Sequence, residues 1–239
     1  MIQQMELRYS DGIDTMVGQL VWDDALRDPA PGVLVAPAFG GLSPFEVATA
    51  EALAGLGYVA LAVDYYGDGK RARNGDEASA WMAVLNADRS ILIRRMQAAL
   101  VALKDQTQVD ATRTGALGYC LGGKAVLDLA RSGAAFQACV PVHGVFDAPE
   151  GVLGPIVPSV LALHGWDDPL ATPQDVEALA AELTKNCADW QIQAFGHTGH
   201  AFTNPMAQDK AGGMMYSERA TKRSWAALTS FLAECLTPE

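Results

Sequence analysis

The sequence predicts an α/β protein with a mostly parallel central sheet that has helices on both faces and an antiparallel N-terminal edge. Six short apolar runs alternate with helical patterns. Parallel strands covered on both faces have such continuous apolar runs, whereas strict alternation of apolar and polar residues is typical of a half-exposed edge strand. We expect parallel strands at 32–38, 58–64, 115–120, 138–143, 159–164 and 191–195, and edge strands at 4–9 and 15–21.

Helix signals lie between the predicted strands. Residues 43–46 (Ser-Pro-Phe-Glu) and 172–175 (Thr-Pro-Gln-Asp) each offer an N-cap hydroxyl, a proline at the first helical position and an acidic residue three positions after the cap. These are the features of a capped helix start. Longer apolar patterns predict a helix over 76–104 and a final helix over 217–235.

Composition limits the possible functions. The chain has 239 residues, of which 50% are hydrophobic and 19% charged, so a packed core is expected. We expect a single domain over 1–239, because no repeat or linker-like segment divides the chain. The net charge is −11 and no basic run exceeds a pair, which argues against nucleic-acid binding.

The N-terminus shows no targeting pattern. It lacks a positive segment followed by an apolar one, and no uncharged apolar run approaches the roughly 20 residues of a membrane span. We therefore expect a cytoplasmic protein without a membrane partner, as a monomer or a weak homodimer. The four cysteines are far apart and form no Cys-x-x-Cys pair, which favours free thiols: Cys120, Cys139, Cys187 and Cys235.

Residues 118–123 (Gly-Tyr-Cys-Leu-Gly-Gly) join a predicted strand to a predicted helix. In a nucleophile elbow, the central residue occupies a strained turn, and its neighbours at −2 and +2 must be small because strand and helix crowd there. Gly118 and Gly122 meet that requirement. Cys120 would lie at a helix N-terminus, which favours the thiolate. A buried structural cysteine is the other interpretation.

A cysteine nucleophile needs a base, and the chain has four histidines. His143 and His164 end predicted strands, where a histidine often holds loops together. His197 and His200 lie in a glycine-punctuated loop after the last predicted strand, where an α/β-hydrolase has its histidine. These two could instead bind zinc, but no third ligand stands at a supporting spacing. We expect no metal and no cofactor.

The carboxylate that orients the base should follow another strand between nucleophile and histidine. Asp167 and Asp168 are adjacent candidates, of which only one can face the histidine, and a simple turn is the other interpretation. The oxyanion would be held by the backbone N–H of Leu121, and by that of Ala38 or Phe39 after the first parallel strand, since Pro37 has none. Ala38 is our first choice.

These motifs resemble the dienelactone hydrolase family of the α/β-hydrolase fold. The matching stretches are 57–64, 118–123, 164–169 and 199–205, and the cysteine in the elbow is the most specific feature, because most α/β-hydrolases have serine there. The resemblance implies a Cys-His-Asp triad that acts on small esters or lactones. It favours Asp168 over Asp167 and His200 over His197, so that Cys120, Asp168 and His200 form the triad.

Two residues depart from that family's pattern. Where the family often has a glutamate thought to hold the resting cysteine, this chain has Pro37, and where dienelactone-cleaving members have an arginine for a substrate carboxylate, it has Asn204. A strict dienelactone specificity is therefore not expected. Five arginines could bind an anion from another direction, although a solvated surface is the favoured interpretation: Arg71, Arg73, Arg89, Arg94 and Arg95.

The sequence thus predicts a small-molecule hydrolase that cleaves carboxylic esters or lactones through a thioester on Cys120. A different class of function is a non-catalytic or redox-sensing protein of the same fold with a reactive Cys120. A Rossmann-type nucleotide-binding function is the least favoured alternative, because 115–122 does not match Gly-x-Gly-x-x-Gly. Large aromatic residues could line the pocket or belong to the core: Trp81, Trp166, Tyr119 and Phe202.

Overall fold

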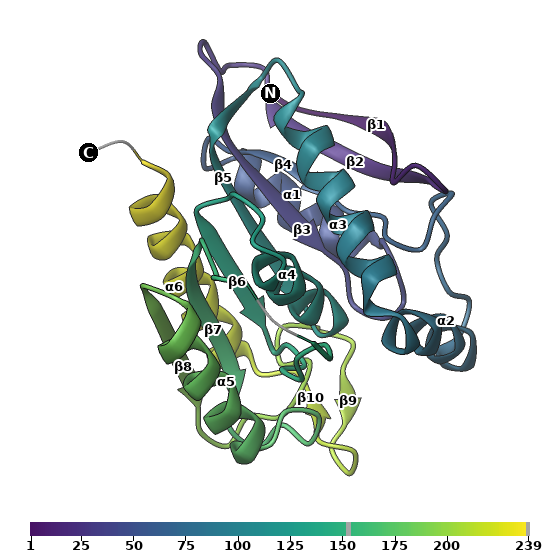
Figure 1. Ribbon diagram of the computed structural model, residues 1–239, viewed down its shortest axis with the longest axis vertical. Coiled ribbons are helices and arrows are strands. Elements are labelled where there is room, and N and C mark those ends of the chain that lie inside the picture. Colours follow the sequence, from purple (N-terminus) through teal and green to yellow (C-terminus); the bar gives the residue numbers. More distant parts are fainter. Residues whose placement is uncertain (152–153, 238–239) are drawn as a thin grey trace.

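The computed structural model describes residues 1–151 and 154–237. Its main feature is an eight-stranded sheet with the order β1-β2-β4-β3-β5-β6-β7-β8 (Figure 1). The first two strands are antiparallel to each other, β2 is antiparallel to β4, and all pairs from β4 to β8 are parallel. The strands are β1 (Ile2–Ser10), β2 (Thr15–Asp23), β3 (Ala30–Ala36), β4 (Val59–Ala62), β5 (Val109–Tyr119), β6 (Ala138–Val142), β7 (Ser159–Gly165) and β8 (Trp190–Phe195).

Helices cover both faces of this sheet. Buried residues of α1 and α6 share one apolar cluster, and those of the other four helices share a second cluster on the opposite face. The helices are α1 (Pro44–Ala54), α2 (Gly75–Ala87), α3 (Arg89–Lys104), α4 (Leu121–Arg131), α5 (Pro173–Asn186) and α6 (Glu218–Leu236). The predicted α/β architecture with an antiparallel N-terminal edge is confirmed.

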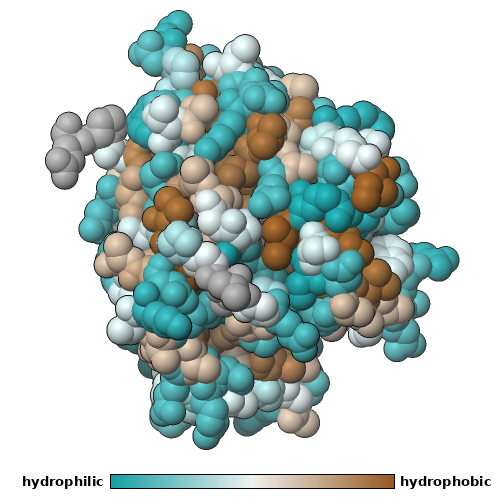
Figure 2. All heavy atoms as spheres, viewed as in Figure 1, coloured by the Kyte–Doolittle hydropathy of each residue, from teal (hydrophilic) through white to brown (hydrophobic). Residues whose placement is uncertain are grey.

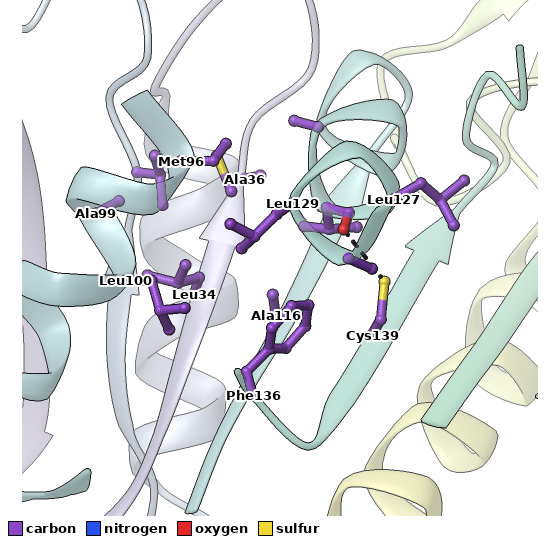
Figure 3. Packing of buried hydrophobic residues seen from close by; sticks show 14 of the residues in the cluster. Leu34, Ala36, Met96, Ala99, Leu100, Ala116, Leu127, Leu129, Phe136 and Cys139 are labelled. Carbon is purple, nitrogen blue, oxygen red and sulfur yellow. Dashed lines mark hydrogen bonds between the residues drawn. The ribbon is translucent and has the colours of Figure 1, made fainter. Parts of the chain in front are cut away.

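Strand β3 shows how the two cores are built. Val33 and Val35 point into the cluster beneath α1 and α6, whereas Leu34 and Ala36 point toward α3 and α4 (Figure 3). Successive side chains of a strand alternate between faces, so an apolar run without polar breaks supplies both cores at once. Because both faces of the central strands are buried, the positions of these strands and of the loops at their carboxyl ends are well defined.

The expected helix over 76–104 is wrong, because the chain forms two helices there. Asp88 has an extended backbone (φ −135°, ψ 90°), so it ends α2, and its carboxylate accepts the Ser90 N–H at 3.0 Å as the N-cap of α3. An aspartate that bonds its local backbone in this way competes with a continuous helix. The sequence analysis also missed a short hairpin, which consists of β9 (Gln208–Asp209) and β10 (Met214–Met215).

Strand β5 runs directly into α4, and two glycines make this turn possible. A Cβ on Gly118 would lie 2.1 Å from the carbonyl oxygen of Gly122, and a Cβ on Gly122 would lie 2.2 Å from that of Ala36. Both neighbours are backbone atoms that cannot rotate away. The requirement for glycine at these positions therefore comes from the close approach of α4 to the ends of β3 and β5.

The surface contains hydrophobic side chains in small separate groups among hydrophilic ones on the face that Figure 2 displays. No helix in the described ranges combines the length and apolar character that a bilayer span requires.

The substitution Gly118→Ala tests the close approach at the β5–α4 turn. It should lower the free energy of unfolding by about 3 kcal/mol, because the new methyl group forces backbone apart in a tightly packed region. Chemical denaturation followed by circular dichroism measures the change. Gly196→Ala is the matched control, since nothing lies within 4 Å of a Cβ there, and equal losses in both variants would contradict the crowding argument.

Candidate active site

Cys120 is the turn residue between β5 and α4. Its backbone has φ 56° and ψ −114°, outside the regions that residues with a Cβ favour, and its side chain is half-buried. Such a conformation costs on the order of 1–3 kcal/mol and persists only where surrounding structure enforces it. Its N–H donates to the carbonyl of Val142 at 3.2 Å. The sulfur thus stands at the N-terminus of α4, where unpaired N–H groups favour negative charge.

His200 and Asp168 lie together on the loops that follow β8 and β7. His200 Nδ1 and Asp168 Oδ2 are 2.7 Å apart, and both side chains are almost completely buried. The other oxygen of Asp168 accepts the Leu170 N–H at 2.8 Å. The carboxylate is therefore fixed by its own turn and holds the imidazole in one orientation.

The unexpected β9–β10 hairpin positions the backbone of His200. The His200 N–H donates to the carbonyl of Gly213 at 2.8 Å, and the His200 carbonyl accepts the Met215 N–H at 3.2 Å. Gly199 is pressed against the same hairpin, since a Cβ there would lie 2.1 Å from the Gly213 oxygen. These contacts hold the histidine loop against the hairpin.

The charge balance around His200 favours its protonated form. Burial lowers the pKa of the ring, but the hydrogen bond to Asp168 and the charges of Asp168 and Cys120 outweigh burial and raise this pKa to about 10. Nε2 has no hydrogen-bond partner within the part of the chain that the structure describes. The imidazole therefore uses Nδ1 for its hydrogen bond with Asp168, and Nε2 stays available to the nearby sulfur and to a reacting group.

The neighbouring candidates lie outside this arrangement. Asp167 and His197 are exposed at 57% and 103% of their side-chain surface, and Asp167 Oδ2 lies 4.0 Å from His197 Nδ1. Such an exposed pair adds little to stability. The structure thus distinguishes the alternative candidates. Asp168 and His200 are buried and face each other, whereas Asp167 and His197 point to solvent.

The strand-end histidines are buried. His143 Nε2 lies 2.8 Å from the Thr203 hydroxyl oxygen, and the His143 ring packs edge-on against His200 with centroids 5.2 Å apart. Burial lowers the pKa of both His143 and His164, so they are neutral. His143 thus holds the loop that contains His200, which is the role expected of a histidine at the end of a strand.

Hydrogen bonds hold the loop after β3, which contains Ala38. The Tyr65 hydroxyl donates to the Pro37 carbonyl at 2.6 Å and lies 3.1 Å from the Ala38 carbonyl, while the Ala38 N–H donates to Glu46 Oε1 at 3.5 Å. Leu121 contributes the first amide of α4, which has no partner within the helix. Sequence reasoning identified Glu46 only as a helix cap and missed its contact with Ala38.

The favoured interpretation of the arginines as solvated is wrong for three of them. Arg89 forms an ion pair with buried Asp128 at 2.6 Å and is only 11% exposed. Arg94 and Arg95 both reach Asp11, and Arg95 also reaches Asp14, on the turn between β1 and β2. These cations fix α3 to its neighbours. Arg71 and Arg73 are exposed, as expected.

The four large aromatic residues divide into two groups. Tyr119 and Phe202 are buried, and both pack against His143 from the side of the core. Trp81 is half-buried against Tyr66 with ring centroids 5.2 Å apart, and Trp166 is exposed next to His164. Of these four residues, the two tryptophans are the more exposed to solvent.

The chain is similar to several known proteins. A sequence model of the dienelactone hydrolase family matches residues 17–236. The solved structure titled m3DLH is 36% identical with a TM-score of 0.93, each chain being covered to 99%. The dienelactone hydrolase-like promiscuous phosphotriesterase P91, from metagenomic libraries, is 35% identical with a TM-score of 0.90 and 98% coverage of each chain. The carboxymethylenebutenolidase homolog of Homo sapiens is 27% identical over 181 residues, which are 74% of this chain and 72% of that protein.

The contribution of the Asp168–His200 pair to stability should depend on pH. The pKa of His200 rises from 6.5 to about 10 on folding, so its charged form stabilises the fold fully below about pH 6.5, and this stabilisation disappears as pH rises through 10. Asp168→Asn should therefore lower the free energy of unfolding by about 2 kcal/mol near pH 6 and by much less above pH 10. Urea titrations at both pH values measure this, and an equal loss at both would contradict the assignment.

Proposed function

Because this chain belongs to the dienelactone hydrolase family and is a carboxylic ester or lactone hydrolase, we propose that Cys120 is its nucleophile, with His200 as base and Asp168 as the residue that orients the base. One observation carries the proposal. The strained Cys120 stands at the start of α4, next to a buried imidazole whose Nδ1 is 2.7 Å from the Asp168 carboxylate. Its neighbours Leu121 and Ala38 supply the amides for the oxyanion.

In the first half of the reaction, the sulfur of Cys120 attacks the carbonyl carbon of the ester. A C–S bond forms, the carbonyl electron pair moves to oxygen, and the N–H groups of Leu121 and Ala38 stabilise the resulting oxyanion. The intermediate collapses to a thioester as the C–O bond breaks, and His200 gives its Nε2 proton to the leaving oxygen. Asp168 keeps the ring oriented throughout.

In the second half, His200 removes a proton from water through Nε2. The hydroxide adds to the thioester carbonyl, the same two amides hold the second oxyanion, and the C–S bond breaks to release the carboxylic acid. The thiolate of Cys120 is regenerated next to the imidazolium. A thiolate expels an enolate or a phenolate readily but an amine poorly, so activated esters and lactones are the expected substrates rather than peptides.

Cys120→Ala tests the assignment of the nucleophile. The variant should lose hydrolysis of p-nitrophenyl acetate by at least about a thousandfold in kcat, because triad members act as a unit. Cys187→Ala is the control, since Cys187 is also a half-buried free cysteine and burial raises the pKa of its thiol. Wild-type turnover in Cys120→Ala would refute the mechanism, whereas alkylation of wild-type Cys120 without turnover of any ester or lactone would favour the redox-sensing alternative.

Asn204 guides the proposal on substrate charge. Its side chain lies on the exposed part of the histidine loop, where Oδ1 accepts the Met206 N–H at 2.9 Å. Four of the five arginines considered as anion-binding groups form ion pairs with carboxylates of this chain. A substrate carboxylate would therefore meet little positive charge from these residues, so we propose that neutral esters and lactones are preferred.

Asn204→Arg should change this preference. The new guanidinium can pair with a carboxylate, so kcat/KM for an acidic lactone should rise by about tenfold relative to p-nitrophenyl acetate. Steady-state rates on both substrates give this ratio, and Asn204→Gln serves as the uncharged control. An equal change on both substrates would show that position 204 does not face the substrate.

We also propose that the chain forms a single domain and that it is a cytoplasmic monomer or weak homodimer. The continuous eight-stranded sheet supports the single domain. All four cysteines are free, which fits a reducing compartment.

A further inference from the structure

Glu46 is a buried acid that the mechanism above does not use. It lies in the first turn of α1, is 2% exposed, and forms a capping box in which its Oε2 accepts both the N–H and the hydroxyl of Ser43, at 2.9 and 2.6 Å. A capping box needs only that oxygen. The second oxygen, Oε1, extends 3.5 Å to the N–H of Ala38.

The contact with Ala38 places a carboxyl group on one of the two amides proposed to hold the oxyanion. An N–H group shared with a carboxylate is less available to a new negative charge, and two negative charges close together repel strongly in a site from which water is excluded. We propose that Glu46 occupies the Ala38 amide in the resting enzyme and competes for it with the oxyanion, so that the negative charge of Glu46 slows acylation. This inference rests on the proposed function, because it requires an oxyanion at that amide.

The surroundings of Glu46 leave its charge uncompensated. Among the residues that the structure describes, no lysine, arginine or histidine forms an ion pair with it. The titratable groups that respond to its charge are the hydroxyls of Tyr65, after β4, and Tyr119, at the end of β5, and both are neutral because burial raises their pKa. The charge of Cys120 also acts on Tyr65. Glu46 thus shares a buried, acidic neighbourhood with the nucleophile.

Glu46 should therefore ionise at a higher pH than an ordinary carboxyl group. Burial raises the pKa of its carboxyl group, although hydrogen bonds from Ser43 and from the backbone N–H of Ala38 pull in the opposite direction. A protonated Glu46 carries no charge to oppose the oxyanion. The competition should accordingly appear only as pH rises and Glu46 ionises.

The test compares Glu46→Gln with the wild-type enzyme by kcat/KM on p-nitrophenyl acetate across about pH 5 to pH 9. The ratio of variant to wild type should be near one at the acidic end and rise to about tenfold at the basic end, the equivalent of about one pKa unit of charge repulsion. A ratio that stays at or below one at every pH overturns the inference. Alkylation of Cys120 by iodoacetamide forms no oxyanion, so its rate should be the same in both proteins, and a parallel increase would show that Glu46 acts on the thiol instead.

Ser43→Ala is the second variant, and it keeps the charge of Glu46 while weakening the same helix cap. It removes one hydrogen bond to the ionised carboxylate, so the pKa of Glu46 should rise. The slowing of acylation that follows ionisation of Glu46 should then begin at higher pH, and rates at the basic end should equal those of the wild type. A gain equal to that of Glu46→Gln at every pH would assign the effect to the loosened cap and overturn the inference. Cys120→Ala is assayed in parallel, because its activity reports on the proposed nucleophile separately from Glu46.

Discussion

The contact between the start of α4 and the ends of β3 and β5 is the constraint on which the site depends. Backbone atoms approach there so closely that Gly118 and Gly122 have no room for a Cβ. The chain can make this turn only if the residue between them takes a strained backbone conformation, which puts the sulfur of Cys120 at the helix N-terminus. Burial of β3 and β5 on both faces supplies the stability that maintains the strain.

The electrostatics of the site follow from this placement. A buried imidazole is ordinarily neutral, as His143 is, because burial disfavours its charge. His200 differs because Asp168 faces one nitrogen and Cys120 lies close to the ring, so its charge is stabilised where water is scarce. Glu46 is buried as well, so water does little to screen its negative charge at the Ala38 amide. One pair of charges supports the proposed chemistry, and a single unpaired charge at the Ala38 amide opposes it.

Local patterns predicted much of the molecule. The strands, the capped starts of α1 and α5 and the tight turn at Cys120 all depend on short stretches of sequence. The proposed order of nucleophile, acid and base rests on such stretches too. The break at Asp88 was missed because helical periodicity continues across it. The contacts of Glu46 with Ala38, of His143 with Thr203 and of the arginines with Asp11 and Asp128 join residues brought together only by folding, so no local pattern could reveal them.

The central claim is that the substrate's acyl group is transferred to one sulfur. Rapid acid quenching of the enzyme during turnover of p-nitrophenyl acetate, followed by peptide mass spectrometry, measures where that group resides. The account predicts one acetyl group per chain, on the peptide that contains Cys120, removable by hydroxylamine as a thioester is. An acetyl group on another residue, or an enzyme that turns over the ester without any covalent acyl group, would contradict it.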